Sequence, residues 1–255
     1  MKKSSIAVWL LFSVCTLSAQ NNGIMGNIRD PYLDNFKFQV PQIGEFMSRI
    51  NGDAVIVDHG DTLSREETLL SLFHKDTCLR DTVVTKAFIK GVIENPTKIH
   101  FEDTTWHAVV TCIINDNKGN DDKISLILRT QKRGDYLYKW VISDAFGDIL
   151  DLKPQKSNPG LMISPADNEL EFPSLSFITN KESVNIVNYI SAGNQINSLS
   201  VFLTLIYNHI ITIKSVLKVQ YIFDDISGYR LVVDRYVGTS KNAGWLISDI
   251  QKTHV

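Results

Sequence analysis

Apolar positions along the chain switch from helical spacing to strand-like runs, and this order then returns. The spacing predicts a helix from Pro41 that ends at Asn51-Gly52, and a short helix that Ser64 caps. A third helix is predicted over 82–94. The apolar positions that carry the first and third helices are Ile43, Phe46, Met47, Ile50, Val84, Phe88 and Val92.

Three runs rich in β-branched and aromatic residues follow these helices, which is typical of strands. They cover residues 99–114, 123–130 and 136–146, with polar turns between them. The first part of the chain is therefore predicted as helices followed by an antiparallel meander.

The same order of elements returns after a segment rich in proline. Helices are predicted over 175–190 and 196–208, and strands over 210–223, 229–236 and 245–250. The pattern indicates two α+β units in one chain.

A similar six-residue motif, which we call the phrase, ends both units. Residues 139–144 read Lys-Trp-Val-Ile-Ser-Asp, and residues 244–249 read Gly-Trp-Leu-Ile-Ser-Asp. The segment 88–93 takes the same place in the first unit as 202–207 in the second, where a helix leads into a long strand. A repeat of this size indicates a tandem duplication. Chance similarity between strand-forming sequences is the alternative.

These breaks set the predicted domains. We predict a signal peptide at 1–19, a flexible lead-in at 20–34, a first domain at 35–152, a linker at 153–166 and a shorter second domain at 167–255. The mature chain is long enough for one large or two medium domains.

The N-terminus has the pattern of a secretion signal. Lys2 and Lys3 precede an apolar run, and Ser18 and Ala19 supply small residues before the cleavage point. The run is much shorter than the roughly 20 residues that span a bilayer. No later segment is long and apolar enough to do so, and we expect an exported protein, periplasmic or extracellular.

A lipid anchor at Cys15 is the alternative. Val14 stands where lipoprotein signals generally have a small residue, so cleavage after Ala19 is favoured. Cleavage leaves Cys78 and Cys112. In an oxidising compartment the two can form a disulfide worth roughly 3–4 kcal/mol by chain entropy. Two separately buried thiols are the alternative.

Composition narrows the classes of partner. The chain is 44% hydrophobic and 21% charged, with a formal net charge of −2 and interspersed acids and bases. These are the proportions of a globular protein rather than a disordered one. They give no reason to expect nucleic acid or anionic lipid as a partner.

The order of elements resembles the NTF2-like (cystatin-like) α+β cone fold. Residues 41–51 match its opening helix, 138–144 its closing strand, and 229–249 its last hairpin. The resemblance implies a sheet curled around helices, with a pocket at the open end, in two tandem copies that pack as an internal pseudo-dimer. Members include small-substrate isomerases and dehydratases, and also binding and dimerisation modules without catalysis, so the fold leaves the function open.

Asp144 is one candidate for acid–base chemistry. Strand alternation puts Trp140, Ile142 and Asp144 on one face, where an acid beside apolar groups has a raised pKa and can act as a base. We favour the alternative, in which the aspartate bonds turn amides and the tryptophan packs in the core.

Asp103 and His107 are the other candidates, because they share one face of a predicted strand. Trp106 beside them favours sheet packing instead. Asp58, His59 and Asp61 have metal-ligand chemistry, but without a further ligand elsewhere a solvated turn is favoured.

The common catalytic motifs are absent from the sequence, and we expect no metal or cofactor. The sequence therefore predicts an exported, non-catalytic protein that binds a small ligand or another protein. The alternative is a small-molecule isomerase, dehydratase or hydrolase with a cone pocket that uses Asp103, His107 and Asp144. A structural envelope component is a third possibility.

Overall fold

The computed structural model describes residues 39–58, 60–74, 82–134, 137–151, 197–238 and 242–253, and isolated positions between 163 and 189. The predicted signal peptide and lead-in lie outside the described residues, as does most of the helix predicted over 175–190. Cys15, His59 and Cys78 lie outside them too.

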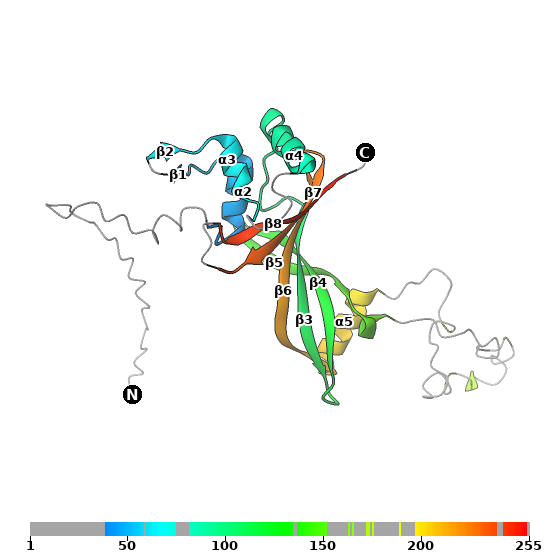
Figure 1. Ribbon diagram of the computed structural model, residues 1–255. Helices are drawn as coiled ribbons and strands as arrows, with labels where there is room; N and C mark the ends of the chain where they lie inside the picture. Colours follow the sequence, from blue (N-terminus) through cyan, green and yellow to red (C-terminus); the bar gives the residue numbers. More distant parts are fainter. Residues whose placement is uncertain are drawn as a thin grey trace, which may run out of the picture.

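One antiparallel sheet of six strands, in the order β5-β4-β3-β6-β7-β8, forms the centre of the fold (Figure 1). The strands are β3 (Trp106–Asp116), β4 (Asp121–Gly134), β5 (Leu137–Phe146), β6 (Ile211–Ile226), β7 (Tyr229–Tyr236) and β8 (Gly244–Lys252). The α+β class is therefore confirmed. Because β3 pairs with β6, each half of the chain contributes three strands to the same sheet. The domain boundaries stay a prediction.

The helices begin and end close to where the sequence pattern put them. They are α2 (Ile43–Asn51), α3 (Arg65–Leu70), α4 (Val83–Glu94) and α5 (Ser198–Tyr207), with a 3-10 turn η1 (Asp148–Leu150) and a small hairpin of β1 (Val57–Asp58) and β2 (Asp61–Thr62). Ser64, the predicted cap of α3, forms a capping box with Glu67. Side-chain caps at Thr82 and Asn197 begin α4 and α5.

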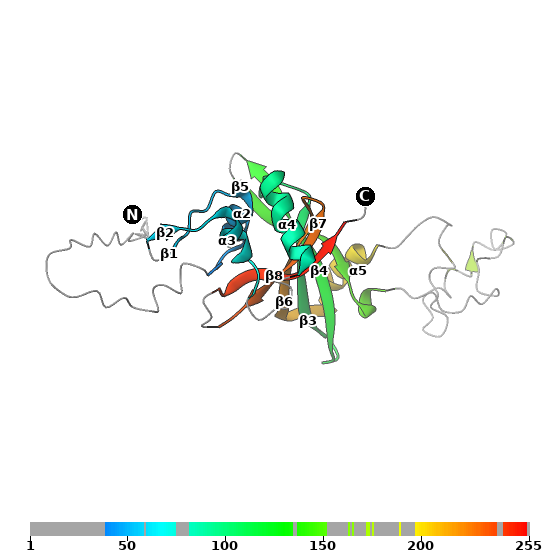
Figure 2. The ribbon, with the colours of Figure 1, turned by 45° about the horizontal axis from the view of Figure 1, so that its top comes forward.

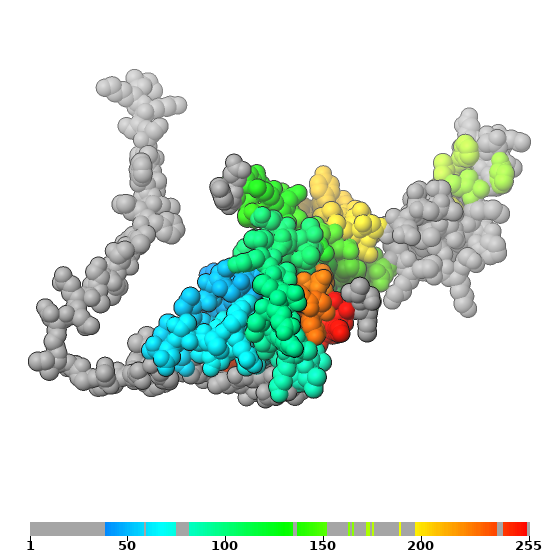
Figure 3. Space-filling model, turned by 90° about the horizontal axis from the view of Figure 1, so that it is seen from above, coloured from blue at the N-terminus to red at the C-terminus, as the bar shows by residue number. Residues whose placement is uncertain are grey.

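Three helices cover one end of the sheet. Figures 1 and 2 show α2, α3 and α4 together at this end, and Figure 3 shows them as a continuous covering from above. Their apolar side chains pack against β6, β7 and β8 in what we call the large core. Its members include Phe46, Met47, Ile50, Leu69, Phe73, Phe88, Val92, Trp106, Phe223, Leu231, Val233 and Ile247.

A single helix covers the other end. Phe202 of α5 is buried against β3, β4, β5 and η1 in a smaller core, which we call the small core. Its other buried members are Cys112, Ile114, Ile124, Leu126, Ala145, Leu150 and Ile211. Helix α4 thus contacts β8 from the second half of the chain, and α5 contacts β5 from the first half.

The repeated phrase lies at the same place in two hairpins. In β4–β5, Leu128 pairs with Ile142 and Ile127 pairs with Asp144. In β7–β8, Val233 pairs with Ile247 and Val232 pairs with Asp249. The pairing thus skips Ser248, just as the pairing in β4–β5 skips Ser143. Each serine is therefore the extra residue of a β-bulge, and each phrase forms a bulged outer strand.

Polar bonds hold both bulges in the same way. The hydroxyls of Ser143 and Ser248 each donate to a carbonyl of the neighbouring strand at 3.2 Å. Asp144 Oδ1 accepts from the amide of the next residue at 2.8 Å, and Asp249 Oδ1 does so at 2.9 Å. The serine of the phrase thus bonds to the backbone of the neighbouring strand, and the aspartate bonds to the backbone of its own strand.

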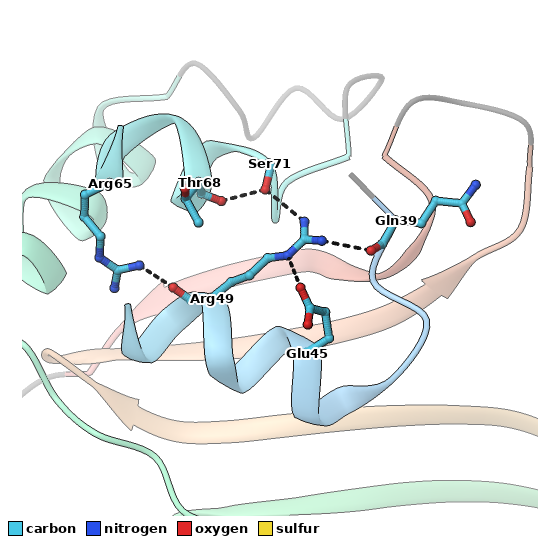
Figure 4. A network of polar contacts seen from close by, with 6 residues as sticks. All are labelled: Gln39, Glu45, Arg49, Arg65, Thr68 and Ser71. Atoms are coloured by element: carbon cyan, nitrogen blue, oxygen red, sulfur yellow. Dashed lines mark hydrogen bonds and ion pairs between the residues drawn. The ribbon is translucent and has the colours of Figure 1, made fainter. Parts of the chain in front are cut away.

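A buried arginine joins α2 to α3 (Figure 4). Arg49 is 1% exposed. It donates to Glu45 Oε1 at 2.9 Å, to Ser71 Oγ at 3.2 Å and to the carbonyl of Gln39 at 2.9 Å. Arg65 donates in turn to the carbonyl of Arg49. Because a buried guanidinium needs such partners, this network fixes how the two helices pack.

Candidate binding groove

Asp103 acts on its own turn. Its Oδ2 accepts from the amide of His100 at 2.7 Å, across the loop that precedes β3. This is the bonding of a turn aspartate. The carboxylate therefore serves local structure.

His107 lies on the face of β3 away from the helices. Its Nδ1 lies 3.4 Å from Asp224 Oδ2, and Arg230 Nε lies 3.5 Å from the other oxygen of that carboxylate. Burial is the main reason that the pKa of His107 is lowered, with Arg129 and Arg230 acting in the same direction and Asp224 opposing them. The imidazole is therefore neutral near pH 7.

Asp144 does not share a face with Trp140 and Ile142, so that prediction is wrong. The bulge at Ser143 adds one residue, and Asp144 pairs with Ile127 on the opposite face. No hydrogen bond or ion pair joins any two of Asp103, His107 and Asp144 in the described structure.

The turn with ligand-type residues lies in the small β1–β2 hairpin. Asp58 pairs with Asp61 across the β1–β2 hairpin, and His59 lies outside the described residues. Within those residues, no group of three or more His, Cys, Asp or Glu is placed to hold a metal ion.

Cys112 is buried in the small core, and burial raises the pKa of its thiol. Its predicted partner Cys78 lies outside the described residues. The disulfide between them stays a prediction.

Aromatic rings meet on the helix-covered face at the middle of the sheet. The ring of Tyr221 lies 4.6 Å from that of Trp245 and 6.4 Å from that of Trp140. Trp106 lies beneath them, 5.5 Å from Trp140. The tryptophans of the two phrases thus approach one central tyrosine, and Trp140 remains 41% exposed.

Beside this cluster the sheet divides. The pairing of β6 with β7 ends at Gln220 and Asp234, while β6 extends back to Ile211. The divergence leaves an opening of about 500 Å³. We call it the β6–β7 fork and define it by residues 216–219, residues 234–237 and Trp245, which line it. Its volume is within the usual range for ligand pockets, about 300–1,000 Å³.

The fork combines apolar walls with a charged rim. Val216, Val219 and Val237 supply aliphatic surface, and Lys218 Nζ lies 3.3 Å from the carboxylate of Asp234. Burial, with Asp234 nearby, raises the pKa of Tyr236. Such a site suits a ligand with an apolar body and a polar end.

The sequence held one signal of the fork that the strand prediction did not use. The strand predicted over 210–223 is much longer than its partner over 229–236, so part of it must lack that partner. In the structure this part is residues 211–219 of β6, and no described strand pairs with them on the side away from β3. We call this stretch the open edge.

Comparisons with protein-family models, curated proteins and solved structures found no match. None of the described helices has the length and apolar character needed to cross a membrane.

Proposed function

We propose that this chain is an exported, non-catalytic binding protein whose ligand or partner lies in the β6–β7 fork. The observation that carries the proposal is the fork itself, an aromatic and aliphatic opening with an ion pair at its rim. Pockets of this composition take ligands by burying apolar surface and orient them through a few polar groups.

The proposed architecture is two tandem NTF2-like domains packed as an internal pseudo-dimer. The equal registers of the two bulged hairpins support it. The pairing of β3 with β6 supports it as well, as does the contact of each of α4 and α5 with the other half of the chain. Export is proposed from the N-terminal sequence pattern.

No observation favours the enzyme alternative. The candidate acids and the histidine each bond or pair with groups outside the set, as the contacts of Asp103, His107 and Asp144 show. The fork holds no histidine, and its carboxylate is paired with Lys218.

A fluorescent apolar probe, 8-anilinonaphthalene-1-sulfonate, tests the fork. Wild-type protein is expected to bind it saturably, and Val219→Glu, which places a carboxylate in the fork, is expected to weaken binding at least tenfold. Val55→Glu is the matched control, since Val55 is exposed and lies outside the fork. Equal binding by all three proteins, with unchanged circular dichroism, contradicts the proposal.

A further inference from the structure

The open edge presents main-chain groups without a strand partner in the part of the chain that the structure describes. Every residue from Thr212 to Lys218 is exposed. Ile213 and Val216 are 46% and 57% exposed. At about 3.4 Å per residue the edge is roughly 30 Å long, and an uncovered edge of this kind is a template for another strand.

Three apolar side chains on one face of the open edge, those of Ile213, Val216 and Val219, are evenly spaced about Val216. Relative to β3, β6 has one extra residue between Val216 and Lys218 and another between Ile213 and Ser215. These bulges turn Ile213, Val216 and Val219 to the helix-covered face, because their partners on β3 belong to the small core or pack on it. Ile213 and Val219 each lie three residues from Val216, so the three positions are symmetric about Val216.

The lysines of this stretch do not guard the edge. Edge lysines usually oppose strand pairing because their charges cannot be buried. Here Lys214 reaches past β3 to Asp121 on β4, at 2.6 Å, and Lys218 reaches Asp234 on β7. Both ammonium groups are therefore balanced by carboxylates of the same chain.

Two strongly exposed apolar residues lie near the open edge. Tyr207, at the end of α5, is 83% exposed, and Val237, in the fork, is 90% exposed. An antiparallel two-fold arrangement brings the start of one edge beside the end of the other. It therefore brings one copy's Tyr207 toward the other copy's fork.

We propose that a second copy of this chain pairs antiparallel with the open edge, about a two-fold axis at Val216. Self-pairing of one strand is isologous, so each contact occurs twice. The partner's Ile213 then lies opposite Val219 and closes one side of the fork. The inference deepens the proposed function, since the dimer completes the wall of the same site, but the dimer itself rests on the edge alone.

Sedimentation velocity of the mature chain and of Val216→Glu tests the dimer. Wild type is expected to sediment as a dimer and the variant as a monomer, because two carboxylates would face each other at the axis. Ile142→Glu, on the exposed outer strand β5, is the matched control and is expected to remain a dimer. Near-ultraviolet circular dichroism checks that each variant is folded.

A monomeric wild type at about 100 µM, where complexes of micromolar Kd are formed, overturns the proposal. So does a Val216→Glu variant that stays dimeric, since the contact then lies elsewhere. An assembly that requires a different polypeptide on this edge overturns it as well.

Cross-linking checks the register. Facing residues in an antiparallel pair have Cα atoms about 4.5–5.5 Å apart, within the range of a disulfide. Val216→Cys is therefore expected to give a covalent dimer under mild oxidation, well above the level of the wild type with its own cysteines. No increase over the wild type contradicts an axis at Val216.

The two proposals fail separately. Probe binding at the fork in a wild type that is monomeric would overturn only the dimer. A dimer that does not bind the probe would overturn only the ligand site.

Discussion

The two ends of the sheet contain equivalent bulged hairpins, β4–β5 and β7–β8, but they differ in the segments that cover them. At one end, three helices bury the large core, and the edge of β8 is covered because Val40 pairs with Gly244 and Phe73 with Ile247. At the other end, one helix covers the small core, and the open edge of β6 has no described strand partner on the side away from β3. A repeated motif therefore fixes the strands, while the surrounding segments decide which end is closed and which is available for binding.

The largest difference is expected from matched phenylalanines in the two cores. Phe88 on α4 and Phe202 on α5 are both buried. Phe88→Ala is expected to lower the free energy of unfolding by about 3–5 kcal/mol, and Phe202→Ala by less, because its thinner cover can close around the cavity. Urea unfolding of both variants measures this. A larger loss at Phe202 would reverse the assignment of the closed end.

The arginine network belongs to the closed end only. Arg49→Met is expected to lower the free energy of unfolding by about 2–4 kcal/mol, since Ser71 and the carbonyl of Gln39 lose a buried donor. Lys90→Met removes an exposed i,i+4 pair with Glu94 and is expected to change it by about 0.5 kcal/mol or less. Thermal unfolding of both variants measures the difference. Equal losses of stability in Arg49→Met and Lys90→Met would show that the network does not stabilise this end.

The covered edge of β8 has its own test. Gly244 has a φ of +107°, and a Cβ there would lie 2.2 Å from the carbonyl oxygen of Val40. Gly244→Ala is expected to cost about 2–3 kcal/mol, because the paired segments must separate. Gly119→Ala, at a positive φ with open space around it, is expected to cost about 1 kcal/mol. Chemical denaturation measures the free energy of unfolding of both variants. Similar losses in Gly244→Ala and Gly119→Ala would mean that Val40 covers the edge of β8 only loosely.

Loss of the serine hydroxyl is expected to lower the stability of the protein by a similar amount in either copy of the phrase. Ser143→Ala and Ser248→Ala each remove one bond from a hydroxyl to a carbonyl and are expected to cost about 0.5–1.5 kcal/mol. Urea unfolding of each variant measures the cost. A cost confined to one serine would show that the bulges are not equivalent.

The smallest expected effect is a pH dependence at His107. Because its pKa is lowered in the fold, the unfolded chain binds more protons, so stability is lost as pH falls below about 6.5, the ordinary histidine value. His107→Gln is expected to flatten the decline in unfolding midpoint between pH 7 and pH 5. An unchanged slope would assign the decline to other groups.

The sequence predicted the elements better than their arrangement. The helices at Ile43, Ser64 and Val83 and the strands of both hairpins follow from local pattern and caps, which act within a few residues. The pairing of β3 with β6 is a contact between distant segments, and no local pattern specifies it.

Part of the candidate site was hidden for the same reason. A bulge adds one residue without a distinctive sequence, so alternation put Asp144 on the wrong face. The fork depends on where β7 stops following β6, which only the unequal strand lengths indicated. His107 was found as a residue type, but its partner Asp224 comes from another strand.

Hydrogen exchange along β6 tests the contrast between the two ends most directly. In the Val216→Glu variant, residues 220–223, which pair with both β3 and β7, are expected to exchange much more slowly than residues 212–218. In the wild type, residues 212–218 are expected to become protected as well. If residues 212–218 exchange as slowly as residues 220–223 in the variant, the edge is not open. If residues 212–218 exchange as fast in the wild type as in the variant, no second copy covers the edge.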